Sequence, residues 1–181
     1  MFELLRFELN LSSDWDDISS AHTFMSSPIY EEFIGVGSKI FDFSSSPYLF
    51  HANYVSHPPN GPRDALITEY ATFVLPAAAS GEQKSALEDA TLNLCTYAVN
   101  ERGCQSFATG WIVEDIKHDQ GTAEKAVGLS ALLGWESVEA HMRNRDDEGF
   151  MALIKTVRGL ALTPTTGYTG TTMFHAKLRK D

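Results

Sequence analysis

The amino-acid sequence predicts an α+β fold whose main part is a ferredoxin-like β-α-β-β-α-β unit over residues 66–181. Two observations lead to this prediction. After residue 65, strand-like and helical patterns follow one another in that order, which is the split β-α-β arrangement. The proline-rich stretch SHPPNGPRD lies just before them, so we expect a linker over residues 57–65. Over residues 1–56 we expect only a partial β-α-β repeat.

Each element of the complete unit follows from its local pattern. Ser80 and Gln83 form a Ser-x-x-Gln capping box, which predicts that a helix begins there, and Gly103 is a suitable stop. Apolar, β-branched and aromatic residues predict strands in LITEYATFVL, SFATGWIVEDI, AVGLSALLGW and TTMFHAKLRK. A single long helix is predicted over SVEAHMRNRDDEGFMALIKTVRGL.

The partial repeat parallels the second half of the complete unit. FELLRFELNL has the composition of a strand, although a helix is an alternative, and PYLFHANYV is a second strand. Between them, apolar residues follow one helical side that is interrupted near Pro28. DWDDISSAH matches GWESVEAH with one extra residue, and LFHANY matches MFHAKL. The corresponding pairs are Trp15 with Trp135, His22 with His141, and His51 with His175.

Charge and composition exclude several classes of partner. The net charge of -10 and a pI near 5.0 argue against nucleic acid or an anionic membrane as the main partner. No apolar run reaches the roughly 20 residues of a membrane span. MFELLRFELN is too short and too charged for a secretory signal, so Cys95 and Cys104 are expected to be reduced thiols. We expect a cytoplasmic protein.

The strings GWESVEAHM and FHAKL, separated by a helix, resemble antibiotic-biosynthesis-monooxygenase-like domains, particularly their fungal branch. This resemblance implies a dimeric α/β barrel, in which open sheet faces pair and enclose the ligand. It implies a homodimer that binds a small hydrophobic or aromatic molecule. Such domains include cofactor-free monooxygenases, polyketide cyclases, haem-degrading enzymes and stress-associated proteins.

Two of these activities lack their motifs here. Haem-degrading members carry an Ala-His pair late in the second helix, where this sequence has GFMALIKTVRG. Plant-type polyketide cyclases carry a His-Pro-x-His string where this sequence has RNRDDEG. We expect no cofactor. We also expect no metal, because Cys95 and Cys104 match no metal spacing and the consecutive Asp146, Asp147 and Glu148 are interpreted as a solvated turn.

Strand alternation sorts the candidate site residues. On the last strand Phe174, Ala176 and Leu178 are apolar and are expected to face the helices, so His175 is expected to face the barrel cavity. On LITEYATFVL the same argument predicts that Tyr70 faces the cavity. The predicted catalytic residues are His175 and Tyr70. The predicted substrate-binding residues are Trp111, Met173, Lys177, His51, Asn53, His141 and His22.

Imidazole can take or give a proton at physiological pH, so His175 is the predicted acid–base group and Tyr70 its partner. The alternative is structural, because a histidine present in both copies of a repeat can serve the fold. Three functions follow. The first is a cofactor-free cyclase or related lyase or isomerase acting on an aromatic or polyketide-like substrate. The second is a cofactor-independent monooxygenase, and the third is a non-catalytic ligand-binding or stress-associated barrel protein.

Overall fold

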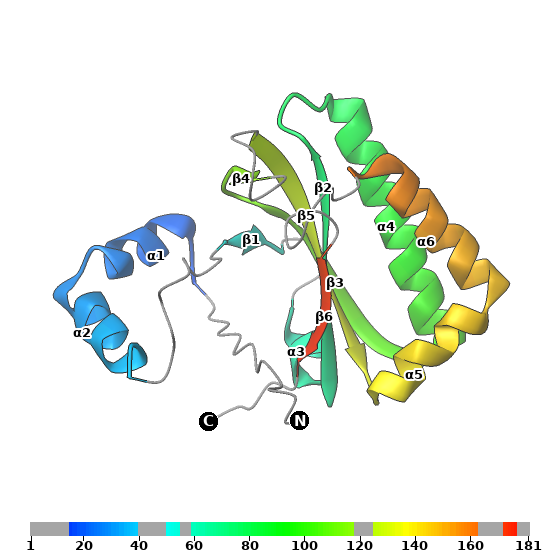
Figure 1. Ribbon diagram of the computed structural model, residues 1–181, viewed down its shortest axis with the longest axis horizontal. Helices are drawn as coiled ribbons and strands as arrows, with labels where there is room; N and C mark the ends of the chain where they lie inside the picture. The colour runs from blue at the N-terminus through cyan, green and yellow to red at the C-terminus, as the bar shows by residue number, and fades with distance from the viewer. Residues whose placement is uncertain (1–14, 40–49, 55–58, 118–124, 163–171, 177–181) are drawn as a thin grey trace, which may run out of the picture. The chain divides into compact units, whose positions relative to one another are not determined.

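The structure is a computed structural model that describes residues 15–39, 50–54, 59–117, 125–162 and 172–176. For residues 101–102, 117 and 172–176 it describes the backbone alone. The chain divides into two compact units, residues 1–49 and 50–181, and each is considered by itself (Figure 1). In the described part of the chain, no helix is long and apolar enough to cross a membrane.

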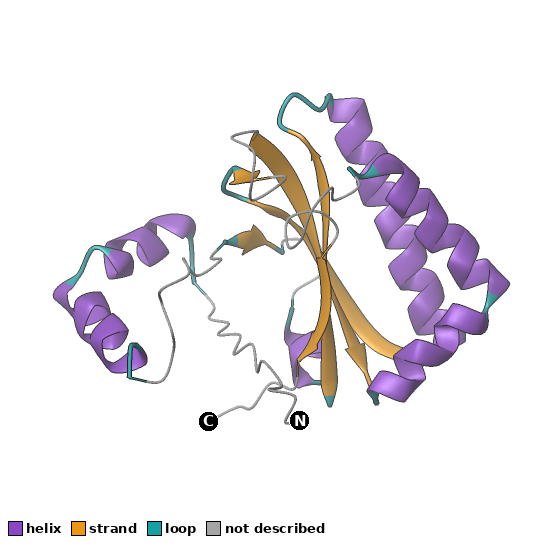
Figure 2. Cartoon of the chain, in the orientation of Figure 1, coloured by secondary structure: helices purple, strands orange, loops and turns teal. Residues whose placement is uncertain are grey.

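The larger unit is built on an antiparallel sheet. Its principal strands are β2 (Ile67–Pro76), β3 (Cys104–Ile112), β5 (Lys125–Trp135) and β6 (Thr172–Ala176). They lie in the order β3-β5-β2-β6, and two short strands, β1 (Ala52–Asn53) and β4 (Ile116–Lys117), pair with β3 and β5. Helices α4 (Gly81–Arg102) and α6 (Glu148–Leu160) cover one face of this sheet (Figure 2). The ferredoxin-like β-α-β-β-α-β unit is therefore confirmed.

The predicted signals at the two ends of α4 are confirmed. Ser80 Oγ accepts a hydrogen bond from the Gln83 backbone N–H at 3.2 Å, and Gln83 Oε1 accepts one from the Ser80 N–H at 2.9 Å. This reciprocal pair satisfies two backbone donors that the first helical turn leaves free. The helix ends at Gly103, whose φ of 75° lies in the left-handed region that glycine adopts without strain.

The long helix predicted over residues 137–160 is broken into three pieces. They are α5 (Val138–Met142), the 3₁₀ turn η1 (Arg143–Asp146) and α6. Asp147 causes the break, because its Oδ1 accepts the Phe150 N–H at 2.7 Å and so starts a new helix. Tyr97 on α4 donates its hydroxyl to the same oxygen at 3.0 Å. A contact between two helices thus decides where α6 begins.

The predicted linker is in part a packed helix. α3 (Asn60–Asp64) lies against the sheet, and the Thr68 hydroxyl donates to the carbonyl of the buried Pro62 at 2.9 Å. Within the described residues 50–54, the strand predicted over PYLFHANYV covers Ala52–Asn53, and it joins the larger unit by pairing with β3. Gly110 permits this close approach, since a Cβ there would lie 2.4 Å from the Asn53 carbonyl oxygen.

The smaller unit contains α1 (Ile18–Met25) and α2 (Pro28–Gly37). Ser27 caps α2 and Pro28 occupies its first turn, so the predicted interruption near Pro28 is confirmed. Trp15 and Phe24 pack with their ring centroids 5.3 Å apart. The strand predicted over FELLRFELNL lies outside the described residues.

Side chains of β2 alternate between the two faces of the sheet, as predicted for LITEYATFVL. Ala71, Phe73 and Leu75 belong to the main core beneath α4 and α6. Val74 lies on the other face, in a small cluster with residues of the neighbouring strands. The other members of this cluster are Ile112, Ile116 and Ala126. The helix-facing side therefore carries the larger core, and it also carries the cavity described next.

Candidate active site

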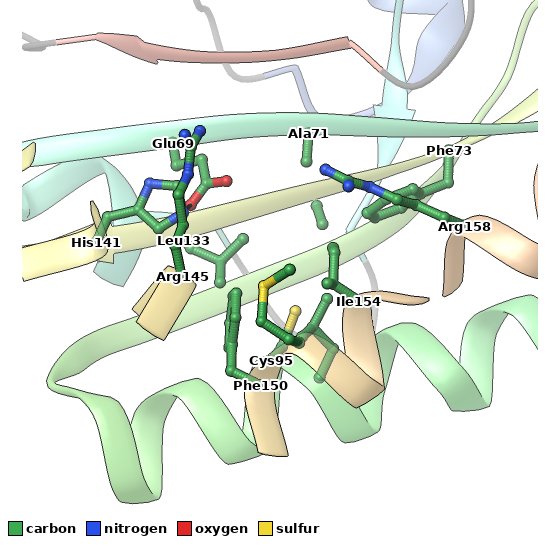
Figure 3. Close-up of a pocket in the computed structure, with 13 residues that line it drawn as sticks. Glu69, Ala71, Phe73, Cys95, Leu133, His141, Arg145, Phe150, Ile154 and Arg158 are labelled. Atoms are coloured by element: carbon green, nitrogen blue, oxygen red, sulfur yellow. Dashed lines mark ion pairs between the residues drawn. The ribbon is translucent and has the colours of Figure 1, made fainter. Parts of the chain in front are cut away.

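A cavity of about 340 Å³ lies between the sheet and the helices of the larger unit (Figure 3). Its size falls within the range of small-molecule pockets. Apolar side chains form most of its wall: Ala71, Phe73, Leu94, Cys95, Ala131, Leu133, Phe150, Met151 and Ile154. Four polar or charged residues complete the lining: Glu69, His141, Arg145 and Arg158. An apolar wall with a few converging polar groups is typical of a ligand site.

Glu69 is a carboxyl group buried in the wall of this cavity. Its side chain comes from β2, on the same face as Ala71 and Phe73, and the residue is only 3% exposed. The Trp135 Nε1–H donates to Oε2 of Glu69 at 2.9 Å. Burial raises the pKa of Glu69 from 4.5 to about 7, although the Trp135 hydrogen bond and the charge of Arg145 act in the opposite direction.

His141 lies beside this carboxyl group and is also only 3% exposed. Its ring stacks on Trp135, with centroids 5.0 Å apart and planes at 25°. Nε2 is 3.6 Å from Oε2 of Glu69, which is too long for a hydrogen bond but within ion-pair range. Ser137 caps α5 by accepting the Ala140 N–H at 3.1 Å, so the short helix starts directly after β5 and carries His141 back over Trp135.

The arrangement can move protons near neutral pH. A carboxyl group with a pKa of about 7 is present in both its protonated and ionised forms there. Trp135 occupies Oε2, whereas Oε1 has no hydrogen-bond partner among the described residues. This second oxygen is therefore available to a molecule in the cavity.

Of the predicted residues whose side chains the structure describes, His141 is the one that lines this cavity. Tyr70 belongs to the other face of β2, since its neighbours Glu69 and Ala71 point into the cavity. The backbone register pairs His175 with Glu69 and Phe174 with Tyr70. Residues opposite each other in antiparallel strands share a face of the sheet, so position 175 belongs to the face of Glu69 and position 70 to the other face. This differs from the predicted alternation of the last strand, in which His175 is expected on the face away from the helices.

The role of His175 stays a prediction. The structure describes its backbone but not its side chain, and the same holds for Met173. Lys177 lies outside the described residues altogether. Only the register position of β6 beside β2 bears on His175 and Met173.

The remaining predicted residues lie elsewhere. The His51 backbone N–H donates to Oε2 of Glu114 at 2.8 Å, and its Nδ1 contacts Oε1 of the same carboxylate. Trp111 donates its Nε1–H to Glu88 on α4 at 3.2 Å, so it faces the helices but does not line the cavity. Asn53 is exposed on β1, and His22 is exposed on α1 of the smaller unit.

Three of the four polar or charged residues that line the cavity were not predicted from the sequence: Glu69, Arg145 and Arg158. A signal for Glu69 was present. It is the one charged residue in LITEYATFVL, and it occurs at the spacing of the helix-facing residues Ile67 and Ala71. A lone carboxylate on the buried face of a strand needs a partner or a raised pKa, and either points to a site. The two arginines have no comparable signal, because exposed arginines on helices are common.

No protein-family model matches the chain, and no curated protein matches it by sequence. Its fold is similar to that of SnoaB, a cofactor-independent oxygenase from Streptomyces nogalater, with 11% identity over 65% of this chain and 97% of that chain and a TM-score of 0.39. A putative antibiotic biosynthesis monooxygenase from Bordetella bronchiseptica is 21% identical over 63% of this chain and 97% of that one, with a TM-score of 0.41. A dimeric Bacteroides fragilis protein of unknown function and ferredoxin-like fold is 8% identical over 62% and 95%, with a TM-score of 0.41.

Likenesses at these TM-scores carry no argument about the activity of the chain. The fold and the cavity define its class directly. It is a ferredoxin-like α+β protein that holds a buried carboxyl–imidazole pair at one end of an apolar cavity between the sheet and its helices.

Proposed function

We propose that the chain is a small-molecule enzyme of the antibiotic-biosynthesis-monooxygenase-like kind, acting without a cofactor on an apolar, aromatic or polyketide-like substrate. The reaction we favour is a proton-transfer step of a cyclase, lyase or isomerase. One observation carries the proposal: Glu69, whose pKa is raised to about 7, opens into an apolar cavity beside His141. Buried groups with such pKa values cluster at catalytic sites.

In the proposed mechanism the ionised Glu69 is the general base. Its Oε1 takes a proton from an activated carbon of the substrate, while Trp135 holds Oε2. The electron pair left on that carbon is delocalised into a neighbouring carbonyl group of the substrate. Protonated Glu69 then returns the proton at another atom, which completes an isomerisation, or assists an elimination. His141 lies beside this carboxyl group, with Nε2 3.6 Å from Oε2, and its ring packs on Trp135.

The same first step also serves cofactor-independent oxygenation, because a carbanion can react with dioxygen. Oxygen uptake during turnover separates this alternative from the cyclase or isomerase reaction. The third alternative, a binding protein without catalysis, is separated by the experiment below.

A neutral probe tests whether Glu69 is a base. 5-Nitrobenzisoxazole loses a ring proton to a base, its N–O bond breaks, and a coloured phenolate appears. We expect the protein to accelerate this ring opening, with a rate that rises with pH through a midpoint near 7 as Glu69 ionises. Glu69→Gln should lower the rate by about 10²-fold or more.

Glu82→Gln is the control, since Glu82 is exposed on the first turn of α4 and does not line the cavity. It should leave the rate unchanged. Equal rates for the wild type and Glu69→Gln would refute Glu69 as the base. His175→Ala belongs in the same assay, because its backbone position lies opposite Glu69. A loss of turnover without a loss of folding would give His175 the catalytic role that the sequence predicted.

We also propose a homodimer, as expected for this kind of domain. β1 pairs only with Trp111 and Ile112, so the outer edge of β3 from Cys104 to Gly110 has no partner strand among the described residues. An open strand edge favours association with another chain. Sedimentation at low micromolar concentration should give twice the mass of the chain. A stable monomer would contradict the proposal.

A further inference from the structure

Two arginines line the cavity. Arg145 lies on η1 and Arg158 on α6, and both side chains are exposed. The chain as a whole carries a net charge of -10, so these two positively charged side chains at one apolar cavity are opposite in sign to the net charge. Neither arginine forms an ion pair with a carboxylate among the described residues. Their guanidinium groups are therefore available to an anion.

The two arginines belong to different ends of the cavity. In Figure 3, Arg145 lies with Glu69 and His141, whereas Arg158 lies towards the end marked by Phe73. Arg145 is near enough to Glu69 for its charge to lower the pKa of that carboxyl group. Apolar side chains line the space between the two ends: Ala71, Leu133, Phe150 and Ile154. The cavity thus has one end with acid–base groups, an apolar middle, and one end with a single cation.

We propose that the cavity binds an organic anion, an apolar ring compound with one carboxylate, in a single direction. Arg158 binds the carboxylate, and the apolar wall covers the ring. The reacting carbon lies at Glu69, and Arg145 faces the negative charge that develops there. This inference rests on the proposed function for the reacting end, while the binding of the anion by Arg158 does not.

The roles of the two arginines differ chemically. The carboxylate of the ligand is charged before and after the reaction, so its bond to Arg158 contributes equally to the ground state and the transition state. Such a contact affects binding and KM. Before the step the negative charge near Arg145 is on Glu69. When the proton moves from carbon to Glu69, this charge passes to a carbonyl oxygen of the substrate, which Arg145 then faces. A cation that faces this charge affects kcat.

A matched pair of probes tests the role of Arg158. 2-Naphthoate and 2-naphthamide have nearly the same shape, but only the first is an anion. Titration calorimetry at neutral pH and low salt should show that the naphthoate binds about tenfold more tightly than the amide, as for one charge-assisted contact. Arg158→Met should remove this preference. Lys155→Met is the control, because Lys155 is exposed on the same helix but does not line the cavity.

Salt provides a second measurement that needs no variant. Naphthoate binding should weaken between low and high salt, whereas naphthamide binding should not. Equal affinity of the wild type for the two probes would overturn the inference, and so would a preference that Arg158→Met leaves intact. The benzisoxazole probe is neutral, so its turnover by Glu69 does not depend on Arg158. Failure of the anion site and failure of the proposed base are therefore distinguishable.

Arg145 is tested by the ring-opening reaction. Arg145→Met should lower kcat about tenfold with KM nearly unchanged, and it should move the midpoint of the pH–rate profile upward. The shift follows because Arg145 lowers the pKa of Glu69. Arg143→Met is the control, since Arg143 lies on the same turn but does not line the cavity. An unchanged midpoint in Arg145→Met would refute this role, because a residue that only supports folding does not move it.

Discussion

Glu69→Gln should remove a large part of the pH dependence of the free energy of unfolding. In the unfolded chain the carboxyl group has its ordinary pKa of 4.5, and in the folded chain burial raises the pKa to about 7. Between these values the folded state keeps a proton that the unfolded state has released. The free energy of unfolding therefore falls as the pH rises through this window, by about 1.4 kcal/mol for each pH unit, or about 3 kcal/mol in all.

The sign is opposite to that of an ordinary ion-paired carboxylate. Below pH 4.5 both states are protonated and the contribution of Glu69 to stability is fully present, whereas above pH 7 it is lost. Glutamine is neutral throughout and keeps a carbonyl oxygen for the Trp135 N–H. The variant should thus match the wild type at low pH and exceed its stability at pH 8. Lower activity with higher stability is common for catalytic residues.

Urea unfolding at pH 5 and pH 8 measures this difference. Glu88→Gln is a matched control, because Glu88 also accepts a hydrogen bond from a tryptophan N–H but is half-buried. Histidines titrate in the same pH range. The quantity to compare is therefore the slope of the free energy of unfolding against pH in the wild type and in Glu69→Gln. If Glu69→Gln keeps the wild-type slope, the carboxyl group does not have the raised pKa on which the site depends.

The second large effect is expected for Trp135→Ala. Trp135 is 0% exposed, and replacing a buried aromatic residue by alanine costs about 3–5 kcal/mol. Two further contacts are lost: the N–H bond to Glu69 at 2.9 Å and the stacking on His141. Trp111→Ala should cost less, because Trp111 is half-buried although it also donates to a glutamate. Thermal and urea unfolding at one pH compare the two variants.

Trp135→Phe separates packing from hydrogen bonding. The phenyl ring preserves most of the apolar contact, but the donor to Glu69 is gone. Since that bond lowers the pKa of Glu69, its loss should raise the midpoint of the pH–rate profile of the ring-opening reaction. Equal stability losses in Trp135→Ala and Trp111→Ala would show that Trp135 is not the central packing residue of the site.

Much of the fold could be predicted because its signals are local. Ser80 and Gln83 start α4 through contacts within one helical turn, and Gly103 ends it through its own backbone conformation. The alternation of Ala71, Phe73 and Leu75 identifies the buried face of β2 without reference to any neighbour. The start of α6 could not be predicted in this way, because Asp147 is also held by Tyr97, fifty positions earlier in the chain.

The candidate site shows the same division. The sequence places Trp135 at a strand end and His141 six residues later on a helix, and it marks Glu69 as a lone charge on an apolar strand face. Nothing in the order of residues states that these three side chains meet, since Glu69 and Trp135 are 66 positions apart. The packing of α4, α5 and α6 on the sheet brings them together and buries the carboxyl group. The helices and strands therefore follow from short-range patterns. The raised pKa of Glu69 and the different chemistry of the two ends of the cavity arise only when distant segments pack together.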